Sequence, residues 1–339
     1  MENNDLEKGF FSRKKIPLSL VIMIVCISGA LGIFLSIRHE TQTGTDTLVV
    51  STITPADTVK LHRHVGKEFT KPLLITEIPG QSPSLFSIRQ KISSYLDSNA
   101  VGNFSNVSVY LLKQNTSEWI GINHEKEYSS PGYLRISVLI SILKLTEKNP
   151  QLLNKKIEYK GNPNSSNYSE LTLTPGKAYT VQKLIEQMML TQDTTPKFLL
   201  NPLLDKKEFI EFHESLGLNK PDLENQKFSI TAAGYSKLLN VIYNGTYLNH
   251  ANSEYVLKLL SNNNKREGIL KFLPEKSKVI HKMSLRFANN QWQVRESGII
   301  YDNNDSYVLT ILISGTDKVL LENACGEIGK IVYDLLSGD

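Results

Sequence analysis

The stretch YSSPGYLR, from Tyr128 to Arg135, opens the segment that decides the fold of this 339-residue chain. From Gly132 to Leu145 the residues are apolar nearly all round, which is typical of a helix buried in a core. Before it, the apolar spacing of Ser84 to Ser98 predicts a helix, and Val107 to Leu112 and Trp119 to Asn123 predict the strands of a hairpin. The buried helix therefore follows one helix and two strands.

After the buried helix, the chain is predicted to form a run of helices and then a run of strands. From about Pro150 to Pro274 it is predicted to be helical throughout, and strands then return before a closing helix. The main helices are Val181 to Leu190, Lys207 to Leu216, Ala232 to Tyr243 and Ser253 to Leu260, the strands Lys278 to Ser284, Gln293 to Tyr301 and Tyr307 to Gly315, and the closing helix Leu320 to Leu336. This order predicts an α/β domain built as an α+β sandwich, with a five-stranded antiparallel sheet, flanking terminal helices and an all-helical subdomain inserted in the middle.

Five local stretches between Ser84 and the C-terminus resemble, in order and spacing, the class A β-lactamases and penicillin-binding serine hydrolases. Tyr128 to Arg135 is similar to the segment leading into S-x-x-K, and Tyr179 to Thr194 is similar to the helix leading into S-D-N. Ile230 to Gly245 is similar to the helix after the Ω loop, and His281 to Ser284 lies where the family has K-T-G. Tyr307 to Gly315 is similar to the last strand. The resemblance implies that fold and, as the family's activity, β-lactam hydrolysis or D-Ala-D-Ala peptidase chemistry.

The first catalytic motif of that superfamily is altered at both functional positions. Gly132 stands where the resemblance places the nucleophilic serine, and Arg135 where it places the lysine. Glycine has no side-chain atom that can form an acyl bond, and arginine stays protonated, so it cannot become the general base that a desolvated lysine can be. In place of the deacylating glutamate the chain offers Asp222 and Glu224, which we expect to be solvated loop acids. The resemblance therefore implies a catalytically degenerate member.

The other two motifs differ from the family as well. Gln192 to Thr194 replaces S-D-N, and a glutamine amide cannot shuttle a proton as a hydroxyl does. Asp193 resembles a loop-organising residue more than a catalytic one. Lys282 remains in the third motif, whereas Met283 removes a hydroxyl and Ser284 adds a side chain where glycine would allow a close approach to the strand edge.

Three residues are candidate ligand contacts, namely Arg135, Gln192 and Lys282. If Arg135 and Lys282 both face the former substrate groove, they place two positive charges where a carboxylate is favoured. The leading hypothesis is a pseudoenzyme that binds cell-wall peptide or a protein partner. An active serine hydrolase that uses unrecognised groups and a ligand-free scaffold stay open, as does a salt-bridged Arg135 at the rim of the cleft.

A relocated nucleophile is an alternative on the buried helix itself. Ser141 to Lys144 also reads S-x-x-K, but it lies on the helix face opposite to Gly132. Ser137 and Lys148 share that face, so the sequence predicts a polar stripe at a solvated or loop-packed edge.

Other nucleophiles and metal sites gain no support from the sequence. Ser129 and Ser130 precede the helix and have no partner base in register. His281 and Lys282 are adjacent on a predicted strand, so their side chains point to opposite faces. No H-E-x-x-H or similarly spaced ligand set occurs, and neither a metal nor another cofactor is predicted.

The N-terminal part of the chain carries the signal of a membrane anchor. Ile16 to Ile37 holds no charged residue over about 22 residues, which is long enough to cross a bilayer. Three basic residues at 13–15 precede it, against Arg38 alone directly after it, which predicts an uncleaved anchor with a cytoplasmic N-terminus.

The expected organisation follows from this anchor. It comprises a cytoplasmic tail at 1–15, the anchor at 16–37, an extracytoplasmic linker at 38–82 and the β-lactamase-like domain at 83–339, with the helical subdomain at about 150–275. The main domain is expected outside a bacterial cell membrane. A net charge of +4, evenly spread, argues against nucleic acid as a partner. The two cysteines, Cys26 and Cys325, imply no disulfide framework.

Overall fold

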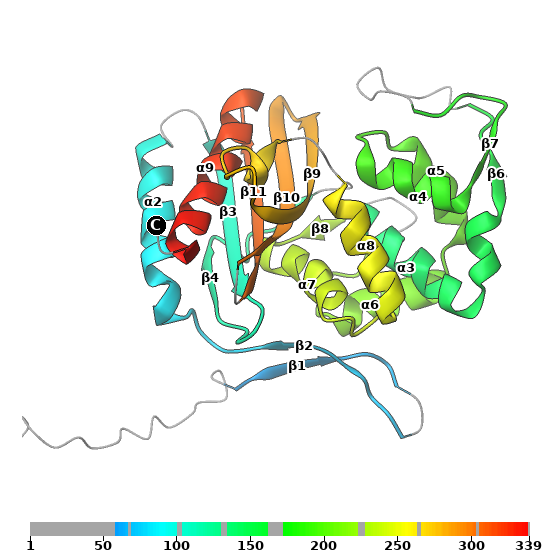
Figure 1. The fold of residues 1–339 in the computed structure, drawn as a ribbon, viewed down its shortest axis with the longest axis horizontal. Helices are drawn as coiled ribbons and strands as arrows, with labels where there is room; N and C mark the ends of the chain where they lie inside the picture. Colours follow the sequence, from blue (N-terminus) through cyan, green and yellow to red (C-terminus); the bar gives the residue numbers. More distant parts are fainter. Residues whose placement is uncertain are drawn as a thin grey trace, which may run out of the picture. The chain divides into compact units, whose positions relative to one another are not determined.

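The described part of the chain begins after the expected anchor. The computed structural model describes residues 58–66, 69–99, 104–129, 134–161, 172–222, 228–262, 266–302 and 305–337 (Figure 1). The expected tail and anchor, residues 1–37, lie outside these ranges. Among the described residues, no helix is both long enough and apolar enough to cross a membrane.

A five-stranded antiparallel sheet with the strand order β4-β3-β11-β10-β9 organises the domain (Figure 1). Its strands are β3 (Phe104–Lys113), β4 (Trp119–Ile122), β9 (Lys278–Ala288), β10 (Gln291–Tyr301) and β11 (Ser306–Gly315). The middle strand β11 is buried along its whole length, because both of its faces are covered. This confirms the predicted sheet and leaves β9 as the edge strand beside the helical subdomain.

The turn between β9 and β10 explains why these two long strands stay in register. Ala288 pairs with Gln291, and the two residues between them, Asn289 and Asn290, have positive φ angles of 53° and 57°. Two left-handed residues match the twist of a two-residue hairpin, and asparagine tolerates that conformation better than most residues.

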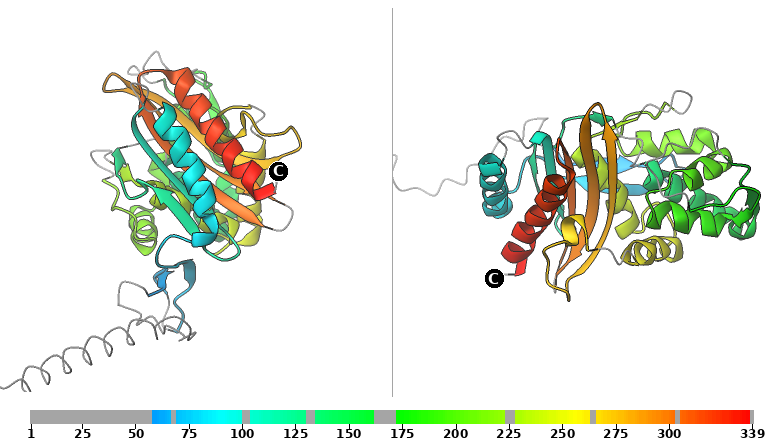
Figure 2. Two further views of the ribbon diagram at one scale, coloured as in Figure 1. Left: turned by 90° about the vertical axis from the view of Figure 1, so that its left-hand side faces the viewer. Right: turned by 90° about the horizontal axis from the view of Figure 1, so that it is seen from above.

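Each face of the sheet has its own hydrophobic core. On one face lie the terminal helices α2 (Phe86–Asn99) and α9 (Lys318–Ser337), side by side (Figure 2). Their apolar residues pack with side chains such as Leu309 of β11, whereas the alternate residue Leu312 packs with the helical subdomain on the other face. The period of two along β11 therefore separates the two cores.

The helical subdomain is not all helical, which corrects the prediction. Its helices are α3 (Leu134–Lys148), α4 (Val181–Leu190), α5 (Thr195–Leu200), α6 (Lys206–Ser215), α7 (Ala232–Tyr243) and α8 (His250–Ser261). Two short antiparallel pairs occur among them, β5 (Tyr128–Ser129) with β8 (Ser229–Ile230), and β6 (Lys156–Glu158) with β7 (Ala178–Thr180). Strands of two or three residues carry no readable periodicity, because tertiary pairing rather than local pattern forms them.

Residues 60–77, within the expected linker, form a hairpin on the domain. Strand β1 (Lys60–Arg63) pairs with β2 (Leu73–Glu77), whose Leu74 and Ile75 are buried in the core of the helical subdomain. Glu77 accepts a 2.7 Å hydrogen bond from His62 and forms a 2.6 Å ion pair with Lys237 of α7. Burial alone would raise the pKa of Glu77, but His62 and Lys237 outweigh it and lower the pKa to about 2.

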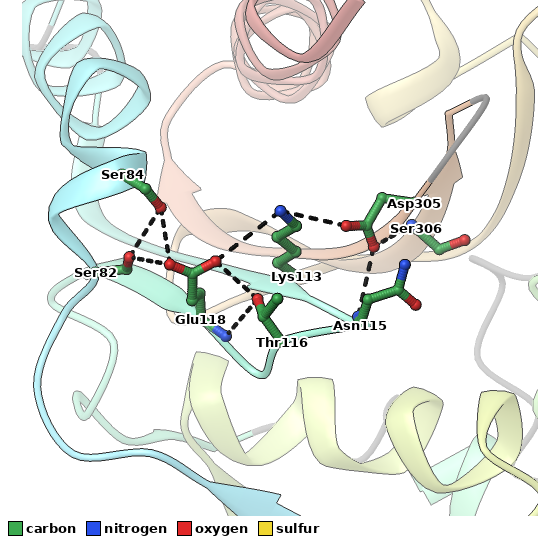
Figure 3. Close-up of polar contacts among 8 residues, drawn as sticks. All are labelled: Ser82, Ser84, Lys113, Asn115, Thr116, Glu118, Asp305 and Ser306. Atoms are coloured by element: carbon green, nitrogen blue, oxygen red, sulfur yellow. Dashed lines mark hydrogen bonds and ion pairs between the residues drawn. The ribbon is translucent and has the colours of Figure 1, made fainter.

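A polar network on the surface fastens the start of α2 to the sheet (Figure 3). Glu118, just before β4, accepts hydrogen bonds from the hydroxyls of Ser82 and Ser84 at 2.8 and 3.0 Å. Lys113 at the end of β3 lies 4.0 Å from Glu118 and 3.4 Å from Asp305. The network joins three segments that are distant in sequence, and its role is to position loops.

Candidate ligand site between α3, the α4–α5 turn and β9

Arg135 lies in the first turn of α3 and is buried, not at a solvent-exposed rim. Its guanidinium group donates hydrogen bonds to the carbonyl oxygens of Met188 (3.1 Å), Thr191 (2.6 Å) and Gln192 (2.7 Å). The last carbonyls of a helix have no partner within that helix, and the planar fork of an arginine can reach several of them at once. Arg135 therefore holds the C-terminus of α4 against α3.

Burial lowers the pKa of Arg135 to about 10, although the charge of Asp193 opposes this shift. The guanidinium group consequently stays protonated at neutral pH. It is a fixed cation and a hydrogen-bond donor, and it cannot accept a proton from a substrate.

Lys282 approaches the same carbonyl groups from the sheet. It is buried on β9, and its ammonium group donates to the carbonyl oxygens of Met189 and of Thr191, the latter at 3.3 Å. The structure thus brings Arg135 and Lys282 to one carbonyl oxygen, that of Thr191, at the end of α4. Both cations stabilise this turn.

Gln192 connects the turn to the edge of the sheet. Its side-chain amide donates a 3.2 Å hydrogen bond to the carbonyl oxygen of Met283, in the edge strand β9. The Met283 side chain packs in the core on the terminal-helix side, and the half-buried Ser284 lies on the strand face that Lys282 shares, by the alternation along a strand. The α4–α5 turn is therefore fastened to both α3 and β9.

Asp193 organises the loop that follows α4. Its buried carboxylate accepts hydrogen bonds from the backbone N–H and the hydroxyl of Thr172, both at 2.9 Å, and from the N–H of Thr195 at 2.8 Å. Burial would raise the pKa of Asp193, but these hydrogen bonds lower it further than burial raises it. Thr194 is the residue before α5, and its side chain makes no cap hydrogen bond.

Lys197 is a site residue that the sequence prediction missed. It lies on α5 and is only 5% exposed. Burial, and then the positive charges of Arg135 and Arg286, lower its pKa to about 8. The sequence does hold a signal, because Lys197 is the one charged residue of the α5 segment TPKFLL. A single charge within an apolar helix indicates either a buried partner or a function.

The polar stripe on α3, expected at a solvated or loop-packed edge, is exposed at Lys148 and packed at its serines. Ser137 is fully buried and lies 3.1 Å from Nε2 of His213 on α6, whose pKa burial lowers to about 4. Ser141 is also buried, and the Lys144 ammonium donates to the carbonyl oxygen of Tyr247 at 2.7 Å. Although Ser137 and His213 form a serine–histidine contact, it is closed to solvent and belongs to helix packing.

Several predicted positions lie outside the described residues or away from the turn. Gly132, Ser130 and Glu224 are outside the described ranges. Ser129 is exposed in β5. His281 lies on the opposite face of β9 from Lys282, as the strand alternation predicts.

On that opposite face, His281 belongs to a buried cluster around Glu296 of β10. Nδ1 of His281 lies 2.5 Å from the Glu296 carboxylate, which also accepts the backbone N–H of Ile269. The adjacent Gly268 has a φ of 56°, and a Cβ there would lie 2.2 Å from the carboxylate oxygens. The cluster is closed to solvent, and within the described ranges no group of His, Cys, Asp and Glu is arranged to hold a metal ion.

Comparisons with known protein families and with curated sequences give one match. A family model described as the beta-lactamase enzyme family matches residues 87–336. No curated protein sequence matches the chain.

Solved structures give the same result for the fold. A glycine-for-serine variant of the TLA-1 extended-spectrum β-lactamase is 18% identical, with a TM-score of 0.66 over 75% of this chain and 99% of that one. A β-lactamase from Xanthomonas campestris pv. campestris is 16% identical, with a TM-score of 0.64 over 74% and 98%. A PBP-A variant, as its acyl-enzyme complex with penicillin G, is 14% identical, with a TM-score of 0.64 over 77% and 100%. At these identities the likeness establishes the fold.

Proposed function

The chain belongs to the beta-lactamase enzyme family, and within that family we propose that it is a membrane-anchored binding protein without serine hydrolase activity. Its ligand is a carboxylate-bearing cell-wall peptide or an acidic protein segment at the outer surface of a bacterial membrane. Ile16 to Ile37 supplies the anchor in this proposal, on the strength of its length and its basic flank.

The observation that carries the proposal is that Arg135 bonds to backbone carbonyl groups. Its guanidinium group is buried and donates to three backbone carbonyls at the position where the family motif has a lysine. A serine nucleophile needs a base that can take its proton, and a protonated guanidinium group cannot do so. The glycine at position 132 supports the same conclusion, because it offers no attacking oxygen.

Reaction with a reporter penicillin tests the proposed absence of serine hydrolase activity. Removal of the nucleophile costs serine hydrolases about a million-fold in turnover. The full-length protein should therefore form no covalent adduct with the penicillin, as measured by intact-protein mass spectrometry, and should not turn over a chromogenic cephalosporin above background. A mass addition mapped to any residue from Ser129 to Arg135 would overturn the proposal in favour of an active hydrolase.

Calorimetric titration with muropeptides tests the binding function. Charged contacts between the ligand and the domain predict weak binding that decreases as the salt concentration rises. Absence of binding at both low and physiological salt would leave the scaffold as the better description of this domain.

A further inference from the structure

Lys197 is a buried residue whose amine has no polar partner among the described residues. Within the described part of the chain, no hydrogen bond or ion pair engages its ammonium group, which lies 5.0 Å from the ring centroid of Phe198. An ammonium group has three donors, and leaving it unpaired in a buried residue is unfavourable because little water is there to solvate the charge. The domain therefore holds a cation here at a cost to its own stability.

The charged groups around Lys197 increase that cost. From α3 comes Arg135, whose donors are bound to the end of α4, and from β9 comes Arg286. Arg286 is exposed and shares a strand face with Lys282. The nearby acid, Asp193 in the α4–α5 turn, is bonded to Thr172 and Thr195. An excess of positive charge therefore remains around Lys197.

From this arrangement we propose that Lys197, with Arg286 beside it, forms an anion-binding site that takes a carboxylate of the ligand. A bound carboxylate would supply the acceptor that Lys197 lacks and would offset the repulsion among the three cations. The lowered pKa of Lys197, about 8, leaves it largely protonated at neutral pH, as anion binding requires. Arg135 and Lys282 then act as positioning residues that hold the turn carrying α5.

The surroundings favour an organic acid over an inorganic anion. Phe198, next to Lys197 on α5, is 40% exposed, and its ring centroid lies 5.0 Å from the Lys197 ammonium group. An apolar ring beside a cation suits a carboxylate attached to a methyl-bearing group, such as the end of a peptide. This choice of ligand rests on the proposed function, whereas the site itself rests on the described residues alone.

The experiment follows Lys197 directly in the full-length protein. Lysines are reductively methylated with ¹³C-formaldehyde, and the Lys197 signal is assigned from its loss in a Lys197→Met variant. Its pKa is then measured by NMR alone, with sodium acetate and with N-acetyl-D-alanyl-D-alanine. Because an anion stabilises the ammonium form, both probes should raise the pKa of Lys197, and affinity should fall as pH rises above about 8. Lys197→Met should weaken binding of the dipeptide by about ten- to a hundredfold.

Lys206→Met is the matched control, because it removes the same charge from an exposed position at the start of α6. It should bind both probes as the wild type does. A Lys197 signal that neither probe moves would overturn the inference, and so would equal binding by the Lys197→Met variant. A response to acetate without any response to the dipeptide or muropeptides would keep the anion site and remove the cell-wall ligand. Muropeptide binding with an unmoved Lys197 signal would keep the cell-wall ligand and remove the anion site at Lys197.

Discussion

The guanidinium group of Arg135 lies 2.6 Å from the carbonyl oxygen of Thr191, and this contact ties the first turn of α3 to the residue that caps the end of α4. The ammonium group of Lys282 donates to the same oxygen from β9. Two cations that a sequence motif assigns to ligand binding therefore hold a buried turn together. Substitutions at these positions should change the stability of the domain before they change any affinity.

Replacing Arg135 with alanine should lower the free energy of unfolding by about 3 to 5 kcal/mol, because it leaves buried carbonyls without a donor. Arg135→Lys should recover only part of this loss, since an ammonium group is a point donor and lacks the planar fork. Urea denaturation of the full-length protein measures both. The exposed Arg286→Ala variant should stay within about 0.5 kcal/mol of the wild type. Equal stability of the two alanine variants would contradict the role given to Arg135.

Lys197→Met should have the opposite effect and stabilise the protein. The pKa of this lysine falls from 10.5 to about 8 on folding, so its charge opposes folding by about 1 to 3 kcal/mol at neutral pH. The penalty is fully present below pH 8 and disappears as pH rises from about 8 toward 10.5, because the unfolded chain binds more protons in that window. Melting temperatures of the wild type and the variant should therefore converge at high pH. A variant less stable than the wild type at pH 7 would argue against an unpaired ammonium.

Gly268→Ala should be severely destabilising. The new Cβ would lie 2.2 Å from the buried Glu296 carboxylate, at a φ of 56°. The clash and the conformational strain together should cost about 3 kcal/mol or more. Gly176→Ala is the matched control, because its φ is 81° but nothing lies within 4 Å of the new Cβ, so only the strain of about 1 to 2 kcal/mol applies. Similar losses in the two variants would show that Glu296 can move aside.

Glu77 should give the domain a dependence on acid pH. Its folded pKa of about 2 lies below the ordinary value of 4.5, so its contribution to stability is present above pH 4.5 and is lost as pH falls toward 2. After allowance for screening by water, we expect about 1 to 2 kcal/mol. Thermal melting between pH 5 and pH 2 should show a shallower loss for Glu77→Gln than for the wild type. The exposed Glu275→Gln variant should follow the wild type.

The sheet and its covering helices could be predicted because their signals are long. Strands such as Gln291–Tyr301 and the helix Lys318–Ser337 repeat one period over ten or more residues, so a local pattern suffices. The β1–β2 hairpin could not be predicted in the same way. Its strands of four and five residues become stable only where Leu74 and Ile75 meet the helical subdomain.

The candidate site was predictable in position but not in the use of its residues. Motif spacing brought Arg135, Gln192 and Lys282 to one place, yet it gave no sign that their partners would be backbone carbonyls. These partners depend on where the C-terminus of α4 packs between α3 and β9, and tertiary packing cannot be read from a local sequence pattern. Lys197 was missed because a motif comparison examines only positions that the motif contains.

The three hydrogen bonds of Arg135 also make its position sensitive to the surrounding sequence. A lysine here would leave some of those carbonyls without a donor, so the residue that the family motif has at this position would weaken this fold. Other donors for the α4–α5 turn would have to be present before a lysine could be accepted. The effect of this one substitution is therefore epistatic, because it depends on which residues surround it.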